Sequence, residues 1–432
     1  MIASLSGIRG VPNQDLGLED VSRFAQNFAT AAGSGKVLLG RDTRASGPML
    51  ARAVAAGIMS RGVDVLDCGI LSTPALFRQS RVNGLPAVMV SASHNEPQFN
   101  GMKFIVDGAG IGQETLEAVL NGKKPIGKVP NGTYRPPPML RYVDDLVEKF
   151  GAGSCEGVKV ALDLGGGAAI SHSPRLLKRL GCEVVSINDT CGVFSRKVDP
   201  VADDLGLLRK VVRKGNCDVG FGFDCDGDRL VVVDSSGKKR SGDYMLTLAI
   251  SELLRGRQER KVVVSLDTTQ AIDDVAKRAG AEVFRAKVGE ANVVGAMKKE
   301  GANLGGEGSS GGLIDGTFNY CRDSMLAAIV ISQGIKRIGR KLYGSVPVYH
   351  QERMALDIQK QKAAKGIKRI AALYENPDMT DGVKVTTGRR SWVLARPSGT
   401  EDVVRVSAEA DSEAAAAGNM KAFAKKLVEL SR

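Results

Sequence analysis

The chain has 432 residues, and its composition of 43% hydrophobic and 25% charged residues is that of a globular protein in water. This length exceeds what one hydrophobic core supports and predicts three or four domains. The formal net charge of +12 allows either a nucleic acid or an anionic small molecule as partner, but the 60 basic residues are spread along the chain and only 5% of residues are aromatic, which disfavours nucleic acid.

No apolar run approaches the roughly 20 residues of a membrane span. The first residues, MIASLSGIRG, lack the basic and apolar regions of a signal peptide. The seven cysteines are scattered without a C-x-x-C pair, which disfavours a zinc site or a disulfide framework. We therefore expect a cytoplasmic protein with free thiols and no membrane partner.

Three segments of the chain predict the same unit, in which a β-branched strand, a polar loop, a helix and a glycine lead into a second strand. They span 36–67, 158–187 and 261–286. Gly62, Gly181 and Gly280 stand where helix C-caps are expected and lie about 100 to 120 residues apart, the size of a domain. Such units form right-handed crossovers in mostly parallel sheets. Chance likeness between unrelated α/β units is the alternative.

We predict an α/β protein with domains at 1–140, 141–245, 246–345 and 346–432. The proline-rich segment YRPPPML (134–140) is typical of a linker after the first domain. After residue 345 the pattern changes to a basic helical stretch (357–374), two strands within 391–410 and an Ala/Lys-rich terminal helix. This last part predicts a separate α+β domain.

The stretch VSASHNEPQFNGMKF (90–104) places Ser93 between small residues and next to His94. Neighbouring residues of an extended loop point apart, and His172 and His350 lie in unrelated contexts, so a Ser-His-Asp triad is disfavoured. The alternative is a phosphorylated Ser93, with a metal on a phosphate oxygen and Lys103 nearby.

In GFGFDCDGDRLVVVD (220–234), a strand leads into Asp224, Asp226 and Asp228 at alternate positions, so that three carboxylates converge on one hard cation such as Mg²⁺. An EF-hand is excluded because its glycine and glutamate positions hold Arg229 and Ser235. Two alternatives remain: an aspartyl phosphatase with Asp224 as nucleophile, and a solvated acidic turn.

Two further loops are rich in glycine and hydroxyl groups. GGEGSSGGLI (305–314) carries Glu307, Ser309 and Ser310, which suit the hydroxyl groups of a sugar, although a flexible surface loop is the alternative. RPSGTEDVVR (396–405) lies between two predicted strands and has the donors that a phosphate dianion needs; they are Arg396, Ser398, Gly399, Thr400 and Arg405. SGIRG (6–10) and GRDTRASG (40–47) also place arginines in glycine-bounded loops, but neither is specific alone.

Together these stretches resemble the α-D-phosphohexomutases, the family of phosphoglucomutase, phosphomannomutase and phosphoglucosamine mutase. The likeness spans the chain and rests on four motifs in family order: SASHN (91–95), DCDGDR (224–229), GEGSSG (306–311) and RPSGTE (396–401). It implies four domains around a central cleft, three of them related α/β units with mixed, mostly parallel sheets, and a C-terminal α+β domain.

The resemblance also implies roles for single residues. Ser93 would be the phosphoserine, and one Mg²⁺ per chain would be held by Asp224, Asp226, Asp228 and a phosphate oxygen on Ser93. The groups implied near the transferring phosphate are Arg9, His94, Lys103 and Arg229, with Lys103 as a proton-transfer group. The groups implied to bind substrate are Lys287, Glu307, Ser309, Ser310, Arg396, Ser398, Gly399, Thr400 and Arg405.

One departure concerns the sugar loop, after which many relatives place a histidine. Here the chain continues Ser310, Gly311, Gly312, which leaves open both the alignment of Ser309 against Ser310 and the second proton-transfer group. The segment GGLIDGTFNYCRDSMLAA is most similar to the archaeal phosphoglucosamine/phosphomannomutase branch of this family. We therefore expect a mutase that interconverts hexose 6-phosphate and hexose 1-phosphate through a 1,6-bisphosphate, with glucosamine phosphate as first choice and mannose or glucose phosphate as alternatives. We expect a monomer or homodimer.

Overall fold

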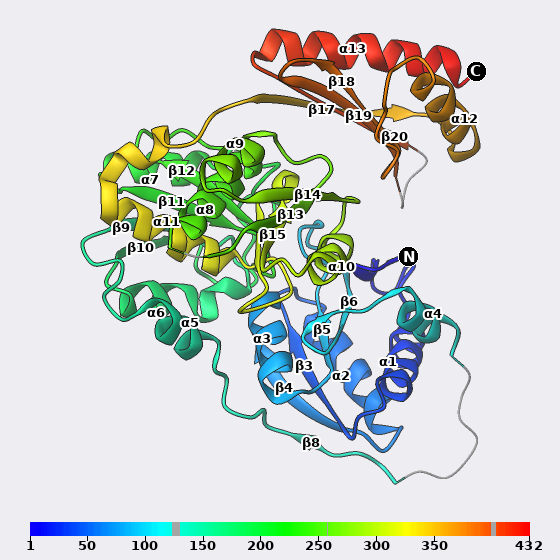
Figure 1. The fold of residues 1–432 in the computed structure, drawn as a ribbon. Helices are drawn as coiled ribbons and strands as arrows, with labels where there is room; N and C mark the ends of the chain where they lie inside the picture. The colour runs from blue at the N-terminus through cyan, green and yellow to red at the C-terminus, as the bar shows by residue number, and fades with distance from the viewer. Residues whose placement is uncertain (123–129, 257, 399–402) are drawn as a thin grey trace.

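The structure is a computed structural model that describes residues 1–122, 130–256, 258–398 and 403–432, folded around four β-sheets (Figure 1). The first sheet has the strand order β1-β2-β6-β5-β3-β4-β8, with β7 paired to β6. Its elements are β1 (Ile2–Ser4), β2 (Gly7–Gly10), α1 (Leu18–Ala32), β3 (Lys36–Arg41), α2 (Gly47–Met59), β4 (Asp64–Ile70), α3 (Thr73–Asn83), β5 (Ala87–Val90), β6 (Asn100–Val106), β7 (Ala109–Gly110), α4 (Gln113–Asn121) and β8 (Tyr134–Arg135).

The second and third sheets have four strands each, in the orders β10-β9-β11-β12 and β14-β13-β15-β16. The second unit consists of α5 (Tyr142–Phe150), β9 (Lys159–Asp163), η1 (Ala168–Ser171), α6 (Ser173–Arg179), β10 (Glu183–Ile187), α7 (Gly206–Lys214), β11 (Val219–Phe223) and β12 (Leu230–Asp234). The third consists of α8 (Gly242–Arg255), β13 (Lys261–Ser265), α9 (Ala271–Arg278), β14 (Glu282–Ala286), α10 (Glu290–Glu300), β15 (Leu304–Glu307), η2 (Gly308–Ser310), β16 (Gly312–Asp315), α11 (Ser324–Ile338) and η3 (Gly339–Gly344).

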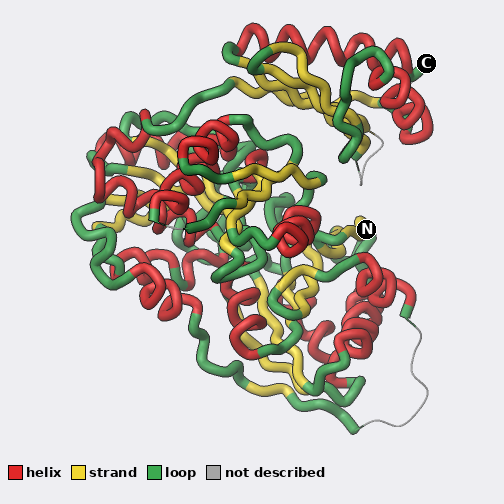
Figure 2. Tube along the Cα trace, viewed as in Figure 1, coloured by secondary structure: helices red, strands yellow, loops and turns green. Residues whose placement is uncertain are grey.

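The fourth sheet, β17-β20-β19-β18, is antiparallel throughout, and its helices lie on the side away from the rest of the molecule (Figure 2). Its core is separate from the cores of the other units. The predicted α+β character of this part is confirmed. Its elements are β17 (His350–Asp357), α12 (Lys360–Ala371), β18 (Val383–Gly388), β19 (Ser391–Pro397), β20 (Val403–Ala410) and α13 (Glu413–Leu430).

The first three units share one topology, which confirms the repeat predicted from the sequence. In each, two strands lie parallel on either side of the first strand, and a fourth is antiparallel to the third: β4-β3-β5-β6, β10-β9-β11-β12 and β14-β13-β15-β16. Gly62, Gly181 and Gly280 all have positive φ angles, of 75°, 94° and 68°, just past a helix. Only glycine takes this conformation without steric cost, so the three glycines terminate equivalent helices.

The segment predicted as a linker is partly a strand, because Tyr134 and Arg135 form β8 and pair with β4. Asp64 stabilises this pairing by accepting hydrogen bonds of 2.8 and 2.6 Å from the backbone and hydroxyl group of Thr133. The prolines that follow cannot donate a backbone hydrogen bond, which is consistent with the position of β8 at the sheet edge. The basic helix also begins later than predicted, since β17 extends to Asp357.

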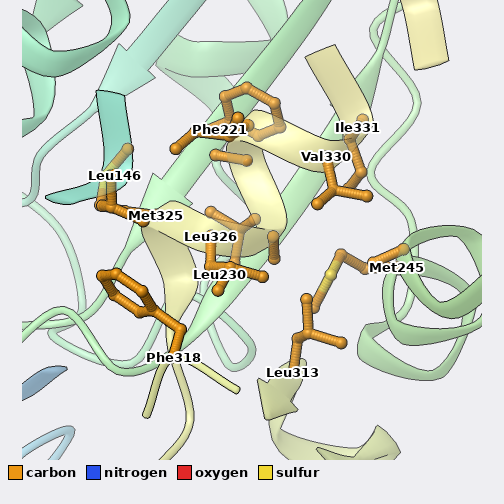
Figure 3. Close-up of a cluster of buried hydrophobic side chains, with 14 of the residues drawn as sticks. Leu146, Phe221, Leu230, Met245, Leu313, Phe318, Met325, Leu326, Val330 and Ile331 are labelled. Atoms are coloured by element: carbon orange, nitrogen blue, oxygen red, sulfur yellow. The ribbon is translucent and has the colours of Figure 1, made fainter. Parts of the chain in front are cut away.

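Helix α11 joins the second and third units, because it packs against β11, β12, β16 and α8. Its residues from Met325 to Ile331 are all apolar and buried, and Figure 3 shows Leu326 and Val330 among Phe221, Met245 and Leu313 from those elements. The same core cluster includes Leu76 and Phe77 of α3 in the first unit. Burial of apolar surface stabilises such packing by about 25 cal/mol per Å². The core cluster shared by the three units therefore holds them together as one body. Among the helices that the structure describes, none has the length and apolar character needed to cross a bilayer.

His172 lies buried where the first and second units meet. Its Nε2 lies 3.1 Å from Ser72 Oγ, and its Nδ1 lies 2.8 Å from Ser171 Oγ. Burial lowers the pKa of His172 from 6.5 to about 3, with Arg175 adding to the effect. The folded protein therefore holds this imidazole neutral, whereas the unfolded chain takes up a proton below pH 6.5.

This difference predicts an acid-dependent loss of stability between pH 6.5 and 3. The contribution of neutral His172 to the free energy of unfolding is present above pH 6.5 and decreases as the pH falls. At pH 5 the folded state should have lost about 2 kcal/mol of stability through His172. The thermal midpoint of wild type should therefore fall more between pH 7 and pH 5 than that of H172Q. The exposed His350 provides the control variant H350Q, which should behave as wild type. Equal falls for wild type and H172Q would contradict the assignment.

Candidate active site

Three of the four motifs occupy the same place in their units. SASHN follows β5, DCDGDR follows β11, and GEGSSG begins with the last two residues of β15, so each motif leads from the third strand to the antiparallel fourth. Carboxyl ends of parallel strands are where α/β proteins bind ligands. The fourth motif, RPSGTE, joins β19 to β20 in the last sheet. The sequence predicted the motifs, and the fold shows that three of them occupy equivalent loops.

Ser93 is fully buried and has a left-handed backbone, with φ of 53°. Its Oγ donates a hydrogen bond of 3.1 Å to Asp224 Oδ2, which joins the serine loop to the aspartate loop. Its backbone N–H donates to Ser91 Oγ at 2.8 Å, and Ser91 in turn donates to Asp42 at 2.7 Å. A non-glycine residue is held in this conformation only when its surroundings determine it, as at many functional sites.

Arg44 holds the whole serine loop in place. It is fully buried and paired with Asp42 at 3.1 Å. Its two terminal nitrogens donate to the carbonyl groups of Ser93, Asn95, Glu96 and Phe99 over 2.5 to 2.9 Å. The five donors of a guanidinium group match this set of acceptors, which a lysine would not. The sequence marked the GRDTRASG segment as weak, so this positioning role was missed.

His94 lies closer to Ser93 than predicted, with Nδ1 3.3 Å from the serine Oγ. The prediction that the two side chains point apart assumed an extended loop and is wrong, because Ser93 is left-handed. Arg229 donates to Nε2 of His94 at 3.3 Å, so the ring proton resides on Nδ1 and points to Ser93. Burial, with Arg229 and Arg9 nearby, lowers the pKa of His94 to about 2. A neutral ring with its proton toward Oγ does not act as the base for Ser93.

Asp224, Asp226 and Asp228 are buried, and one oxygen atom from each lies within 4.8 Å of the others. Oδ1 of Asp226 and Oδ1 of Asp228 are buried and accept no hydrogen bond within the described parts of the chain. Unsatisfied buried carboxylate oxygens are costly unless a cation completes them. Burial, followed by repulsion from Asp228 and Asp226, raises the pKa of Asp224 well above its usual range. The donor set therefore fits a hard divalent cation such as Mg²⁺.

Lys103, at the middle of β6, pairs with Asp226 at 2.5 Å and with Asp228 at 3.1 Å. Burial disfavours its charge, but the attraction of these two carboxylates prevails and raises its pKa, so Lys103 holds its proton. Thr73, at the start of α3, donates through its hydroxyl to Asp226 and through its backbone N–H to the Asp226 carbonyl. The first unit therefore orients two aspartates of the second.

Arg9 and Arg229 add positive charge beside the aspartates. Arg9 lies on β2 and donates to Asn95 at 2.9 Å, while Arg229 pairs with Asp199 at 3.1 Å. Nε of Arg229 is buried and donates to no acceptor in the described chain. A guanidinium donor of this kind, beside His94 and the aspartate cluster, suits an incoming phosphate oxygen.

Hydrogen bonds to both oxygens of the Glu307 carboxylate hold the sugar loop in place. Gly289 N–H donates to Oε1 at 2.7 Å, and Arg322 donates to Oε2 at 3.2 Å. Ser310 is buried, with its hydroxyl 3.3 Å from the Glu307 carbonyl, whereas Ser309 lines a cavity. Lys287 is exposed two residues before Gly289, in the loop between β14 and α10. The two serines thus face different surroundings, which their sequence did not distinguish.

Ser309 faces the predicted phosphate loop across a cavity of about 310 Å³. Arg396 and Arg405 stand directly opposite each other on β19 and β20 and line the same cavity. Like charges at directly opposed positions of a sheet repel each other, and an anion in the cavity would offset this repulsion. Ser398 is buried just after β19, and Gly399 and Thr400 lie outside the described residues. Asp267 and Arg353, which the sequence analysis did not single out, also line this cavity.

Comparisons with known proteins match the chain in four consecutive parts. Models described as phosphoglucomutase/phosphomannomutase alpha/beta/alpha domains I, II and III match residues 2–125, 140–237 and 241–349, and the model of the C-terminal domain matches 357–426. A probable phosphoglucosamine mutase of Thermococcus kodakarensis is 35% identical over 424 residues, which cover 94% of each chain.

A phosphoglucomutase/phosphomannomutase of the same organism is 31% identical, again over 94% of each chain. The crystal structure of a phosphoglucomutase/phosphomannomutase family protein from Burkholderia thailandensis has a TM-score of 0.87 and 25% identity, covering 100% of this chain and 98% of that one. Relatives with different substrates in their names match at similar identity, so identity alone does not select the sugar.

The aspartate cluster predicts a specific response to Mg²⁺. Without metal, D224N should be at least as thermally stable as wild type, because the amide removes charge repulsion and keeps the shape of the side chain. Saturating Mg²⁺ should raise the thermal midpoint of wild type, by the equivalent of about 2.7 kcal/mol at a hundred times Kd, and that of D224N much less. Asp204, whose side chain is 75% exposed, gives the control D204N. An equal Mg²⁺ response in D224N would place the cation elsewhere.

Proposed function

The chain belongs to the phosphoglucomutase/phosphomannomutase family, as the four motifs predicted, and from this premise we propose that it interconverts hexose 6-phosphate and hexose 1-phosphate through a phosphorylated Ser93. The observation that carries the proposal is the 3.1 Å hydrogen bond from Ser93 Oγ to Asp224, within a cluster of three buried aspartates. This contact supports the proposal, because a phosphoryl group on Ser93 would lie beside a divalent cation bound by the aspartates.

Ser93 would carry the phosphoryl group, and Asp224, Asp226 and Asp228 would hold Mg²⁺, which when bound supplies positive charge next to the phosphate oxygens. The hydroxyl oxygen of a hexose phosphate forms a bond to phosphorus while the bond from phosphorus to Ser93 Oγ breaks. The proton of the sugar hydroxyl ends on Ser93 Oγ, so no further reactant is needed. The product is a hexose 1,6-bisphosphate, which returns its other phosphoryl group to Ser93 by the same step reversed.

Lys103 and Arg229 suit the charge that develops in this transfer. Lys103 is protonated and fixed between two aspartates, so it suits the stabilisation of negative charge. If it gives its proton to Ser93 Oγ, it takes up the proton of the sugar hydroxyl in the same step, so that its own charge is unchanged. Arg229 has a buried Nε donor that meets no acceptor among the described residues. Positioning and charge neutralisation provide most of the catalysis of phosphoryl transfer, which fits a site without a strong base.

The phosphate that does not react would lie between Arg396 and Arg405, with Ser309 on the opposite wall. Its distance from the reacting end is set by the sugar, so the bisphosphate must turn over to present its second phosphate to Ser93. Two phosphate sites of different chemistry therefore serve one substrate in both orientations.

We propose glucosamine phosphate as the preferred substrate. The cavity that Arg396 and Ser309 line also contains the carboxylate of Asp267, which is held by a 2.7 Å hydrogen bond from Ser265. An ammonium group on C2 of the sugar gains an ion pair there, whereas a hydroxyl group gains only a hydrogen bond. Of the two Thermococcus kodakarensis relatives, the probable phosphoglucosamine mutase has the higher identity, 35% against 31%, a small difference in the same direction.

The direct test is ³¹P NMR with Mg²⁺, a trace of hexose 1,6-bisphosphate, and glucosamine, glucose or mannose 6-phosphate. Wild type and the surface control S195A should form the hexose 1-phosphate, fastest with glucosamine, and S93A should form none. A phosphatase that uses Asp224 would instead release inorganic phosphate and would retain activity in S93A. Both oxygens of Asp224 already accept hydrogen bonds, which disfavours that alternative.

The assignment of Asp267 predicts a change in sugar preference. D267N should lower kcat/KM for glucosamine 6-phosphate about tenfold or more, the cost of losing one charged hydrogen bond. Activity toward glucose 6-phosphate should change little, which makes the second sugar the control within one variant. Equal losses with both sugars would show that Asp267 has only a structural role.

A further inference from the structure

Arg322 links the aspartate loop to the sugar loop. It lies between β16 and α11, directly before Asp323, whose side chain caps α11. Only 11% of the arginine side chain is exposed. Its nitrogens contact carboxylates on three separate elements: Nη2 donates to Asp228 at 2.9 Å, Nη1 to Glu307 at 3.2 Å and Nε to Glu290 at 3.1 Å.

The contact with Asp228 determines which oxygen of that carboxylate is left for a cation. Arg322 and Lys103 both donate to Oδ2 of Asp228, at 2.9 and 3.1 Å. Oδ1 is the buried oxygen that accepts no hydrogen bond within the described chain. The guanidinium group therefore occupies Oδ2 of Asp228 and leaves Oδ1 as the oxygen that is available to a cation.

The contact with Glu307 fixes a carboxylate of the sugar loop. Arg322 takes Oε2 while Gly289 N–H takes Oε1, so the plane of this carboxylate is set from both sides. Glu290 anchors the arginine itself, because its Oε2 accepts from both Nε and the backbone N–H of Arg322. A planar fork with fixed donor directions holds three carboxylates in one arrangement, whereas an ammonium group provides no such directions.

Gly312 makes room for this arginine. A Cβ atom at position 312 would lie 2.2 Å from Cδ and 2.6 Å from Cγ of Arg322. Gly312 does not have a positive φ, so its backbone would accept alanine and only the arginine stem excludes a side chain there. The lack of a side chain at Gly312, the first residue of β16, is therefore what allows the stem of Arg322 to lie there.

We propose that Arg322 is a positioning residue that couples the cation site to the sugar site, an inference that rests on the proposed mutase function. By holding Asp228 and Glu307 with one rigid group, it keeps the cation site, where phosphoryl transfer occurs, at a fixed position relative to the sugar site. Its charge alone would not do this, so the fork geometry is the property to test.

The first experiment compares R322K with wild type by calorimetric titration of Mg²⁺ and by steady-state kinetics with the best hexose 6-phosphate. R322K keeps the positive charge and loses the fork, so we expect about tenfold weaker Mg²⁺ binding and about tenfold higher KM. R240K is the matched control, because Arg240 pairs with buried Asp234 at 2.6 Å and contacts none of the site residues described above. Wild-type Mg²⁺ affinity and KM in R322K would overturn the proposal.

A second experiment leaves Arg322 in place. G312A should displace the arginine stem and reproduce the weaker Mg²⁺ binding and higher KM. In R322A the space is empty, so adding G312A should change neither value further. Independent, additive effects of the two substitutions would show that Gly312 does not act through Arg322.

The two proposals fail in different ways. Wild type that forms no hexose 1-phosphate would refute the proposed function, whereas the Mg²⁺ titrations would still measure the role of Arg322. Active wild type with R322K and G312A unchanged in both measurements would refute only the coupling. The thermal midpoint of each metal-free variant tells a local change from a general loss of folding: a fall in R322K no larger than in R240K is expected, and a much larger fall would reduce Arg322 to a structural ion pair.

Discussion

The repulsion among three buried carboxylates is the constraint on which the rest of the site depends. Asp224, Asp226 and Asp228 lie within 4.8 Å of one another, in surroundings that exclude most water. Cations from three units offset this repulsion: Lys103 from the first, Arg229 from the second and Arg322 from the third. Burying charge is costly unless it is paired and hydrogen-bonded. The loop of one unit is therefore stable only when the other two are in place.

The repeated topology explains how one arrangement supplies three different functions. Each unit offers the loop between its third and fourth strands, and these loops carry a serine, an aspartate cluster and a glutamate. Helix α11 is buried between the second and third units, and its first turn reaches the aspartate loop, where Ser324 donates to the Gly227 carbonyl at 2.5 Å. The packing that buries α11 in the core therefore also sets the position of the aspartate loop. The fourth unit has its own core and contributes Arg396 and Arg405, of the predicted phosphate loop, to the wall of the cavity.

The sequence predicted those features that depend on local pattern. Alternating aspartates, the glycines past three helices and the four motifs all follow from short stretches, and the repeat and family assignment based on them are confirmed. It missed residues whose roles come from contacts distant in the chain: Arg44 reaches Ser93 across 49 residues, and Arg322 reaches Asp228 across 94. It also misjudged Ser93 and His94, because a left-handed serine is set by the surrounding hydrogen bonds and leaves no local signal. The glycine at position 312 is a visible trace of Arg322, but only the folded chain shows which side chain fills its space.

Peptide mapping by mass spectrometry would locate the phosphoryl group that we assign to Ser93. The purified protein would be incubated with Mg²⁺ and hexose 1,6-bisphosphate, digested, and mapped before and after a chase with hexose 6-phosphate. We expect one phosphate, on Ser93, which is stable to hydroxylamine and is lost to the sugar during the chase. A hydroxylamine-sensitive phosphate on Asp224, or a phosphate on Ser93 that the sugar does not remove, would contradict it.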